Sequence, residues 1–146
     1  MTDADPRTLS REDLPLLAAF AVALSATLGA LFIGEVLGQM PCTLCWYQRI
    51  AMFPLVVILG IAALRDDPSA RFPAVILALA GLAVAIWHSG LYAGIIPQAI
   101  APCTKDGPSC TDAAAQTVLG LPLPYLSLLA FAAILACLSQ LKGNRA

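Results

Sequence analysis

Two cysteines separated by two residues are the side chains of this sequence best suited to chemistry. They lie at residues 40–49 (MPCTLCWYQR), between two apolar runs. If Cys42 opens the helix that follows, it and Cys45 occupy positions i and i+3 on one face, where a disulfide can close and reopen. The helix N-terminus and the guanidinium of Arg49 both favour the thiolate form. The pattern predicts a redox-active pair, and the alternatives are half of a zinc site or two inert buried cysteines.

A second pair, Cys103 and Cys110, lies in the one long polar stretch of the chain, residues 95–122. The residues between the two cysteines include Asp-Gly-Pro, a turn signal that would bring the sulfurs together. A structural staple for this loop is the alternative. Two dithiols in one small protein can exchange disulfides by thiolate attack without a prosthetic group. The same four sulfurs could instead form a Cys₄ zinc site, although the second spacing is wider than usual.

The segments that must position these cysteines are strongly apolar. Of 146 residues, 60% are hydrophobic and 12% are charged, whereas soluble domains are typically about 45–50% apolar. The net charge of −1 provides no basic face for nucleic acid. Segment lengths predict an all-α membrane protein, a single four-helix transmembrane domain over residues 1–146 with an exterior redox loop at 95–122. The predicted helices cover residues 14–37, 46–64, 72–93 and 123–141.

Several local features refine this topology. Residues 14–37 are too long for the apolar core of a cleaved signal peptide, so we expect this segment to remain as the first helix. Pro54 is expected to kink the second helix. The spacings Gly34/Gly38 and Gly90/Gly94 are typical of close contacts between membrane helices.

Basic residues predict the orientation. With four spans, both termini lie on the same side as the hairpin at residues 65–71. Six basic residues fall on that side, whereas Arg49 and Lys105 fall on the other. Because cytoplasmic segments carry the excess of Lys and Arg, the termini are predicted to be cytoplasmic and both cysteine pairs exterior, where disulfides form. The six residues are Arg7, Arg11, Arg65, Arg71, Lys142 and Arg145.

An exterior dithiol pathway needs a terminal electron acceptor. A structural disulfide with a reduction potential of about −300 mV cannot oxidise a thiol carrier whose potential is about −120 mV, so a stronger oxidant must take the electrons. Cys45 and Arg49 are predicted at the membrane end of the second helix. A lipid-soluble quinone could therefore reach them from the bilayer.

Residues 41–50 (PCTLCWYQRI) closely resemble the signature of the DsbB/BdbC family of disulfide-bond formation membrane proteins, and the WYQR continuation is similar to its BdbC branch. The resemblance extends to the four spans and to the second cysteine pair before the last helix. It implies an enzyme of the bacterial inner membrane that uses ubiquinone or menaquinone to reoxidise a DsbA-like thioredoxin-fold partner. The sequence departs from the DsbB branch in having a short second loop, without an interfacial helix between its two cysteines.

The resemblance also implies residue roles. Cys103 would form the mixed disulfide with the partner, and the released Cys110 would attack Cys42. Cys45 would then meet the quinone, and Arg49 would stabilise negative charge on it. The family also implies a quinone-proximal histidine near His88, which could otherwise be a hydrogen-bonded packing residue.

Two further side chains and three alternative functions complete the sequence-based hypotheses. Glu35, in the last turns of the first helix, could pair with Arg49 or be an ordinary interfacial acid. Cys137 is interpreted as a packing residue, and no resident metal is predicted. The alternatives are a vitamin K epoxide reductase-like enzyme, a conduit that carries reductant outward, or a non-catalytic membrane scaffold stabilised by zinc or disulfides.

Overall fold

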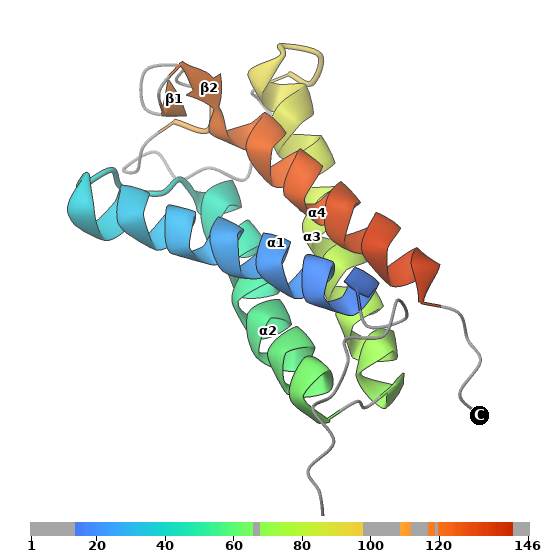
Figure 1. Ribbon diagram of the computed structural model, residues 1–146. Helices are drawn as coiled ribbons and strands as arrows, with labels where there is room; N and C mark the ends of the chain where they lie inside the picture. Colours follow the sequence, from blue (N-terminus) through green and yellow to red (C-terminus); the bar gives the residue numbers. More distant parts are fainter. Residues whose placement is uncertain (1–13, 66–67, 98–108, 112–116, 119, 142–146) are drawn as a thin grey trace, which may run out of the picture.

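Four long helices form the protein, as the apolar segments predict (Figure 1). The computed structural model describes residues 14–65, 68–97, 109–111, 117–118 and 120–141. The helices are α1 (Leu14–Leu31), α2 (Thr43–Arg65), α3 (Arg71–Tyr92) and α4 (Leu123–Gln140). A π-helical segment, η1 (Phe32–Val36), extends α1, and a single 3₁₀ turn, η2 (Pro68–Ala70), precedes α3. All four are long and apolar enough to cross a membrane, α1 together with η1, so this is a multi-pass membrane protein.

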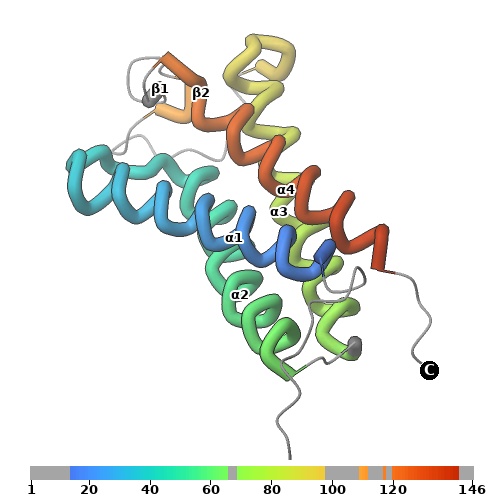
Figure 2. Tube along the Cα trace, in the orientation of Figure 1, coloured from blue at the N-terminus to red at the C-terminus, as the bar shows by residue number. Residues whose placement is uncertain are grey.

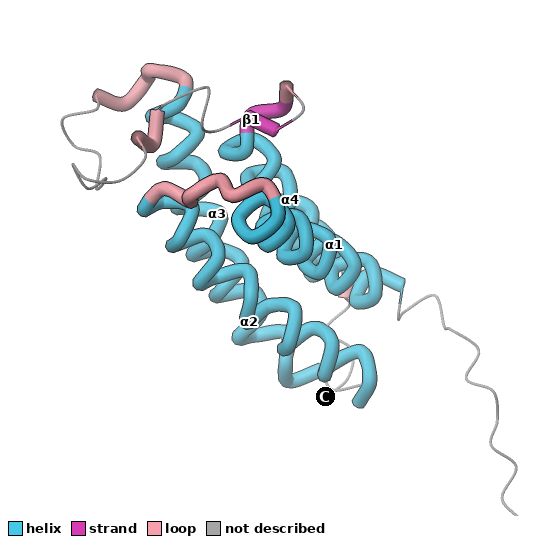
Figure 3. Tube along the Cα trace, turned by 90° about the vertical axis from the view of Figure 1, so that its left-hand side faces the viewer, coloured by secondary structure: helices cyan, strands magenta, loops and turns pink. Residues whose placement is uncertain are grey.

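Each helix packs on two neighbours in a closed ring: α1 lies on α2 and α4, and α3 lies on the same two helices. Figure 2 traces this order along the chain, and Figure 3 shows the helices side by side. The start of α2, the end of α3 and the start of α4 lie together at one end of the bundle. The residues of the predicted redox centre therefore gather at that end.

Small residues let the helices approach closely. The main core combines buried alanines of α1 and α3 with larger side chains of α2 and α4. A Cβ on Gly81 would collide with the ring of Phe131, so α3 meets α4 at this glycine. The sequence analysis expected Gly38 and Gly94 to allow close contacts between helices. Both residues instead have positive φ values, 67° and 72°, the left-handed conformation that ends a helix. Many large apolar side chains remain exposed around the ring, as expected for surfaces that face lipid.

Two details of the structure differ from the predictions. Helix α2 begins at Thr43, earlier than the predicted residue 46, because the Trp46 N–H already donates to the Cys42 carbonyl oxygen at 3.0 Å. The helix continues past Pro54, and the kink expected there stays a prediction. The segment predicted as a loop also contains a short hairpin directly before α4, in which β1 (Thr117–Val118) pairs antiparallel with β2 (Leu121–Pro122).

Contacts between α3 and α4 fix the start of the last helix beside the predicted redox centre. Ser89 donates a hydrogen bond to the Pro124 carbonyl oxygen at 3.2 Å. The rings of Tyr92 and Tyr125 meet edge to face, with centroids 5.6 Å apart. The position of α4 is thus tied to the part of α3 that carries His88.

Candidate redox site

Cys42 occupies the N-cap position of α2, because the helix begins at the next residue. The backbone N–H of Cys45 points at the Cys42 sulfur at 3.4 Å, the bond that a polar side chain makes when it caps a helix. The two sulfurs are 3.1 Å apart and are not bonded to each other. A sulfur in this position lies at the positive end of the helix dipole, which stabilises a thiolate. The expected i, i+3 dithiol geometry is present.

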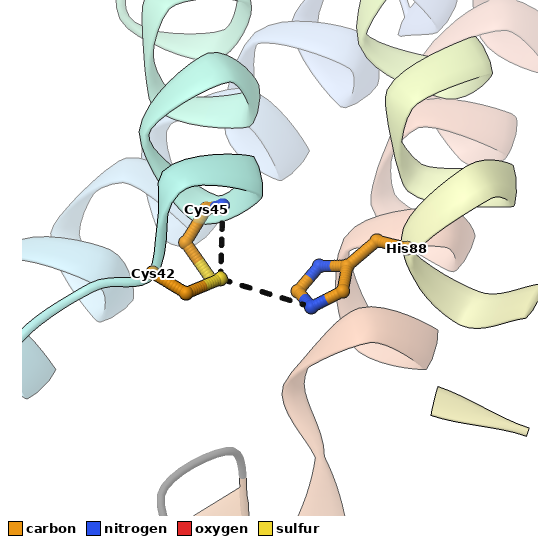
Figure 4. Close-up of side chains that lie close together, drawn as sticks. All are labelled: Cys42, Cys45 and His88. Atoms are coloured by element: carbon orange, nitrogen blue, oxygen red, sulfur yellow. Dashed lines mark hydrogen bonds between the residues drawn. The ribbon is translucent and has the colours of Figure 1, made fainter. Parts of the chain in front are cut away.

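His88 lies against this pair from α3. Its Nε2 is 3.8 Å from the Cys42 sulfur, and the side chain is completely buried (Figure 4). On its other side, Nδ1 lies 3.3 Å from the Gln48 side-chain amide. Gln48 is itself buried, one turn along α2 from the cysteines. A carboxamide can donate or accept, so Gln48 can support either neutral tautomer of the imidazole.

Cys110 reaches the same place from the loop. It is buried in a small cluster with Cys42, Leu44 and Leu91, apart from the main core. Cys110 is disulfide-bonded. Its predicted partner, Cys103, lies outside the described residues. The Cys₄ zinc alternative required Cys110 as a thiolate ligand, and a disulfide sulfur cannot serve in that way.

A cavity of about 600 Å³ opens beside the pair, between α1, α2 and the start of α4. Both Cys42 and Cys45 line it, together with Arg49 and Gln48. Most of the remaining lining is apolar. One exception is Gln39, whose buried Oε1 has no hydrogen-bond partner. A largely apolar cavity with a few polar groups at one end is typical of small-molecule sites.

Arg49 is held by α1 at the edge of this cavity. Its guanidinium donates to the Ala30 carbonyl oxygen at 2.7 Å and lies over the Trp46 ring, 5.5 Å from the centroid. The sequence-based hypothesis offered Glu35 as its partner, but Glu35 is exposed in η1, and the guanidinium instead donates to the Ala30 carbonyl oxygen. Arginine suits this position because its planar group can stack and donate at the same time.

Gly34 provides the space that the guanidinium occupies. A Cβ at this residue would lie 3.1 Å and 3.3 Å from the two terminal nitrogens of Arg49, closer than ordinary contact. Gly34 is part of η1, and π-helical segments are frequent at functional sites. The π-helical segment η1 and its Gly34 therefore determine where the guanidinium of Arg49 can lie.

A Gly34→Ala substitution should displace Arg49 by a few tenths of an ångström and raise the KM of a substrate that binds in this cavity by roughly three- to tenfold, since small misplacements of a positioning group are costly. Steady-state kinetics in which the concentration of that substrate is varied measures this. Gly29→Ala is the matched control, because a Cβ there meets nothing within 4 Å although Gly29 lines the same cavity. Equal KM changes in the two variants would contradict the assigned role of Gly34.

Comparison with known proteins shows the family of this chain. The family model for the disulfide bond formation protein DsbB matches residues 12–141. The chain belongs to the DsbB family. It is 56% identical over 117 residues to a probable disulfide formation protein of Metapseudomonas resinovorans, covering 80% of this chain and 81% of that protein.

A second relative is the disulfide bond formation protein C of Bacillus subtilis, 36% identical over 132 residues, which are 89% of this chain and 94% of that one. The probable disulfide formation protein of Deinococcus radiodurans is 42% identical over 135 residues, 87% of this chain and 88% of that protein. No solved structure matches significantly. The family predicted from the sequence is thus confirmed for this DsbB-family protein, and its relatives include proteins named disulfide bond formation protein C.

The structure brings together most of the residues that the sequence singled out. Cys42, Cys45, His88 and Arg49 lie at one end of the bundle, and Cys110 joins them. His88 contacts the thiol pair and is not among the residues that line the cavity. Cys137 packs against the main core, consistent with a packing role.

Sequence reasoning missed the two glutamines of the site. Gln48 could have been suspected, because it is an amide side chain in an otherwise apolar helix and directly precedes Arg49. Gln39 precedes the motif in the connection between α1 and α2, where a polar residue is ordinary and gives no signal.

Proposed function

We propose that this DsbB-family protein is a thiol:quinone oxidoreductase that reoxidises a thioredoxin-fold thiol oxidase outside the cytoplasm. The observation that carries the proposal is the cavity, which is lined by Cys42, Cys45 and the cationic side chain of Arg49. The electrons would leave the partner's dithiol through Cys103/Cys110 and Cys42/Cys45. A membrane quinone, ubiquinone or menaquinone, would receive them.

The residues present fit a quinone. The volume of about 600 Å³ falls within the roughly 300–1,000 Å³ usual for small-molecule sites. Apolar side chains of α1 and α4 suit a ring and the start of an isoprenoid tail, and the side chains of Arg49 and Gln39 could bond ring oxygens. The buried Oε1 of Gln39 has no hydrogen-bond partner. If the amide turns so that its N–H₂ group takes the place of Oε1, that group can donate to such an oxygen. A bound quinone supplies the capacity to accept two electrons and two protons.

The proposed thiol steps take the order that the family resemblance implies. The partner's thiolate attacks Cys103 and releases Cys110, which attacks Cys42 and releases Cys45. The burial of Cys110 in one cluster with Cys42 supports this transfer. The partner's second thiolate then frees Cys103, and Cys103 attacks Cys110. The outer disulfide is restored, the partner is oxidised, and Cys42 and Cys45 are both left reduced.

His88 is placed to handle the proton of Cys42. Its Nε2 lies 3.8 Å from the sulfur, so the imidazole can take the thiol proton when the inner disulfide re-forms. The Gln48 amide nitrogen lies 3.3 Å from Nδ1 on the other side of the ring; when both ring nitrogens carry protons, the amide must turn so that its oxygen accepts the hydrogen bond from Nδ1. The contact with quinone that the family resemblance implied for His88 stays a prediction.

The orientation is part of the same proposal. The excess of basic residues at the termini and at the hairpin after α2 supports a cytoplasmic location for those segments. The cysteine end of the bundle would then face the exterior, where both pairs meet an oxidising compartment.

An anaerobic assay tests the function. Purified protein, a reduced thioredoxin-fold partner and a soluble quinone analogue are mixed, and the quinone absorbance is followed. We expect the absorbance to fall in proportion to partner thiols consumed, one quinone for two thiols. Partner oxidation with no loss of quinone, or no oxidation at all, would rule the proposal out.

A further inference from the structure

We propose that the reduced redox centre is also a binding site for a thiophilic divalent metal ion, with Zn²⁺ held by Cys42, Cys45 and His88. The oxidised protein would lack this site because the disulfide removes both sulfur ligands. No electron is transferred in the binding step: two thiol protons leave and two sulfur–metal bonds form. The site goes beyond the relay, since it makes the centre sensitive to metal ions in one redox state only.

The donor atoms are already gathered. The two sulfurs and the nearer imidazole nitrogen all lie within 4.8 Å of one another. Tetrahedral zinc, with Zn–S near 2.3 Å and Zn–N near 2.0–2.1 Å, needs sulfurs about 3.7 Å apart and sulfur–nitrogen distances of about 3.5 Å. The observed values are 3.1 Å between the sulfurs and 3.8 Å from Cys42 to His88. Small side-chain rotations close the difference, without movement of a helix.

Gln48 completes the surroundings that a zinc-bound histidine requires. Ligating histidines almost always donate their other ring N–H to a neighbouring acceptor, which fixes the tautomer and the ring orientation. The carboxamide of Gln48 lies 3.3 Å from Nδ1, and its oxygen can take that hydrogen when the amide is turned. His88 is therefore oriented with Nε2 toward the sulfurs, as a ligand would be.

Charge and access also suit a zinc ion. Two thiolates and a neutral imidazole balance the charge of a divalent cation, which lowers the cost of placing it in a buried site. Sulfur and imidazole are donors that favour zinc over magnesium or calcium. Cys42 and Cys45 line the cavity, which provides an entry path and room for a water molecule as the fourth ligand.

The expected consequence is reversible inhibition by metal. Zinc holds both sulfurs of the inner pair, so they can neither re-form the disulfide nor give electrons to a quinone while the ion is bound. This consequence rests on the proposed function, but metal binding itself does not. Relay activity is therefore measured in the presence of a chelator, and metal binding is measured without partner or quinone, so that the two proposals can fail independently.

The binding test uses a full-length chain in which the two inner-pair cysteines alone remain, made by Cys103→Ser, Cys110→Ser and Cys137→Ala. The reduced protein should bind one Zn²⁺ by equilibrium dialysis, and Co²⁺ used as a probe should give sulfur-to-metal charge-transfer absorption and the visible bands of a tetrahedral site. The same protein, oxidised at Cys42 and Cys45, should bind none. Both measurements use the same variant, so the difference between the two redox states does not depend on any effect of the substitutions on folding.

Substitutions then separate the three-ligand site from an ordinary dithiol. His88→Ala should weaken zinc binding at least about tenfold, and Gln48→Ala about 10–100-fold, the usual cost of losing a group that orients a ligand. The chain has one histidine, so the ¹⁵N resonances of its imidazole report directly whether Nε2 binds the metal. Zinc bound equally well after His88→Ala, imidazole resonances that do not move on adding zinc, or no uptake by the reduced protein would each overturn the proposal.

Discussion

Replacing Cys45 with serine should lower quinone reduction by roughly a thousandfold or more, because removal of a reacting nucleophile is among the most damaging changes an enzyme can suffer. The inner disulfide cannot form without this sulfur, which lies 3.1 Å from that of Cys42 and lines the cavity. Cys42→Ser should have a loss of the same size. Anaerobic quinone absorbance with excess reduced partner measures both variants.

Cys137→Ser is the matched control for these variants. It removes the remaining thiol that is not disulfide-bonded among the described residues, and this partly buried side chain packs against the main core. We expect its turnover to remain within about twofold of the parent, as for a substitution remote from the chemistry. Undiminished turnover in either Cys42→Ser or Cys45→Ser would refute the relay through the inner pair.

Replacing Arg49 with alanine should reduce the kcat/KM for quinone about 100-fold, the scale of removing one group that stabilises developing negative charge. The guanidinium borders the cavity and is fixed by Ala30 and Trp46, so the cation is oriented before a substrate arrives. Binding of the reduced partner should change little, because in the proposed relay the partner engages the loop that carries Cys103. Steady-state titration of quinone and a partner-binding assay give the two numbers.

Arg49→Lys tests whether charge alone is sufficient. Lysine keeps the cation but loses the planar group that stacks on Trp46 while donating to Ala30, so we expect an intermediate loss. An equal loss of quinone use and partner binding in Arg49→Ala would count against the assigned place of this residue.

The helices and the inner cysteine pair could be predicted because their signals are local. Apolar runs long enough to span lipid predict the ends of the helices closely. With η1 counted as part of the first span, the largest difference is the start of α2, which lies at Thr43 and was predicted at residue 46. Cys42 and Cys45 are near in sequence, so helical geometry alone places their sulfurs together.

Contacts between helices could not be derived in the same way. His88 is 46 positions from Cys42 and 40 from Gln48, and no local pattern indicates that α3 brings the ring to the pair. The seat of Arg49 depends on Gly34 in η1, and a π-helical segment leaves no mark in the hydrophobic pattern of the sequence. The cavity likewise exists only once α1, α2 and α4 are packed.

A single-turnover measurement tests the central claim most directly. A chain carrying Cys103→Ser and Cys110→Ser is reduced, freed of reductant and mixed anaerobically with one equivalent of a quinone analogue. The account predicts that one quinone is consumed per protein and that mass spectrometry finds a new disulfide between Cys42 and Cys45, without any partner present. Quinone that persists with both thiols still reduced would contradict it.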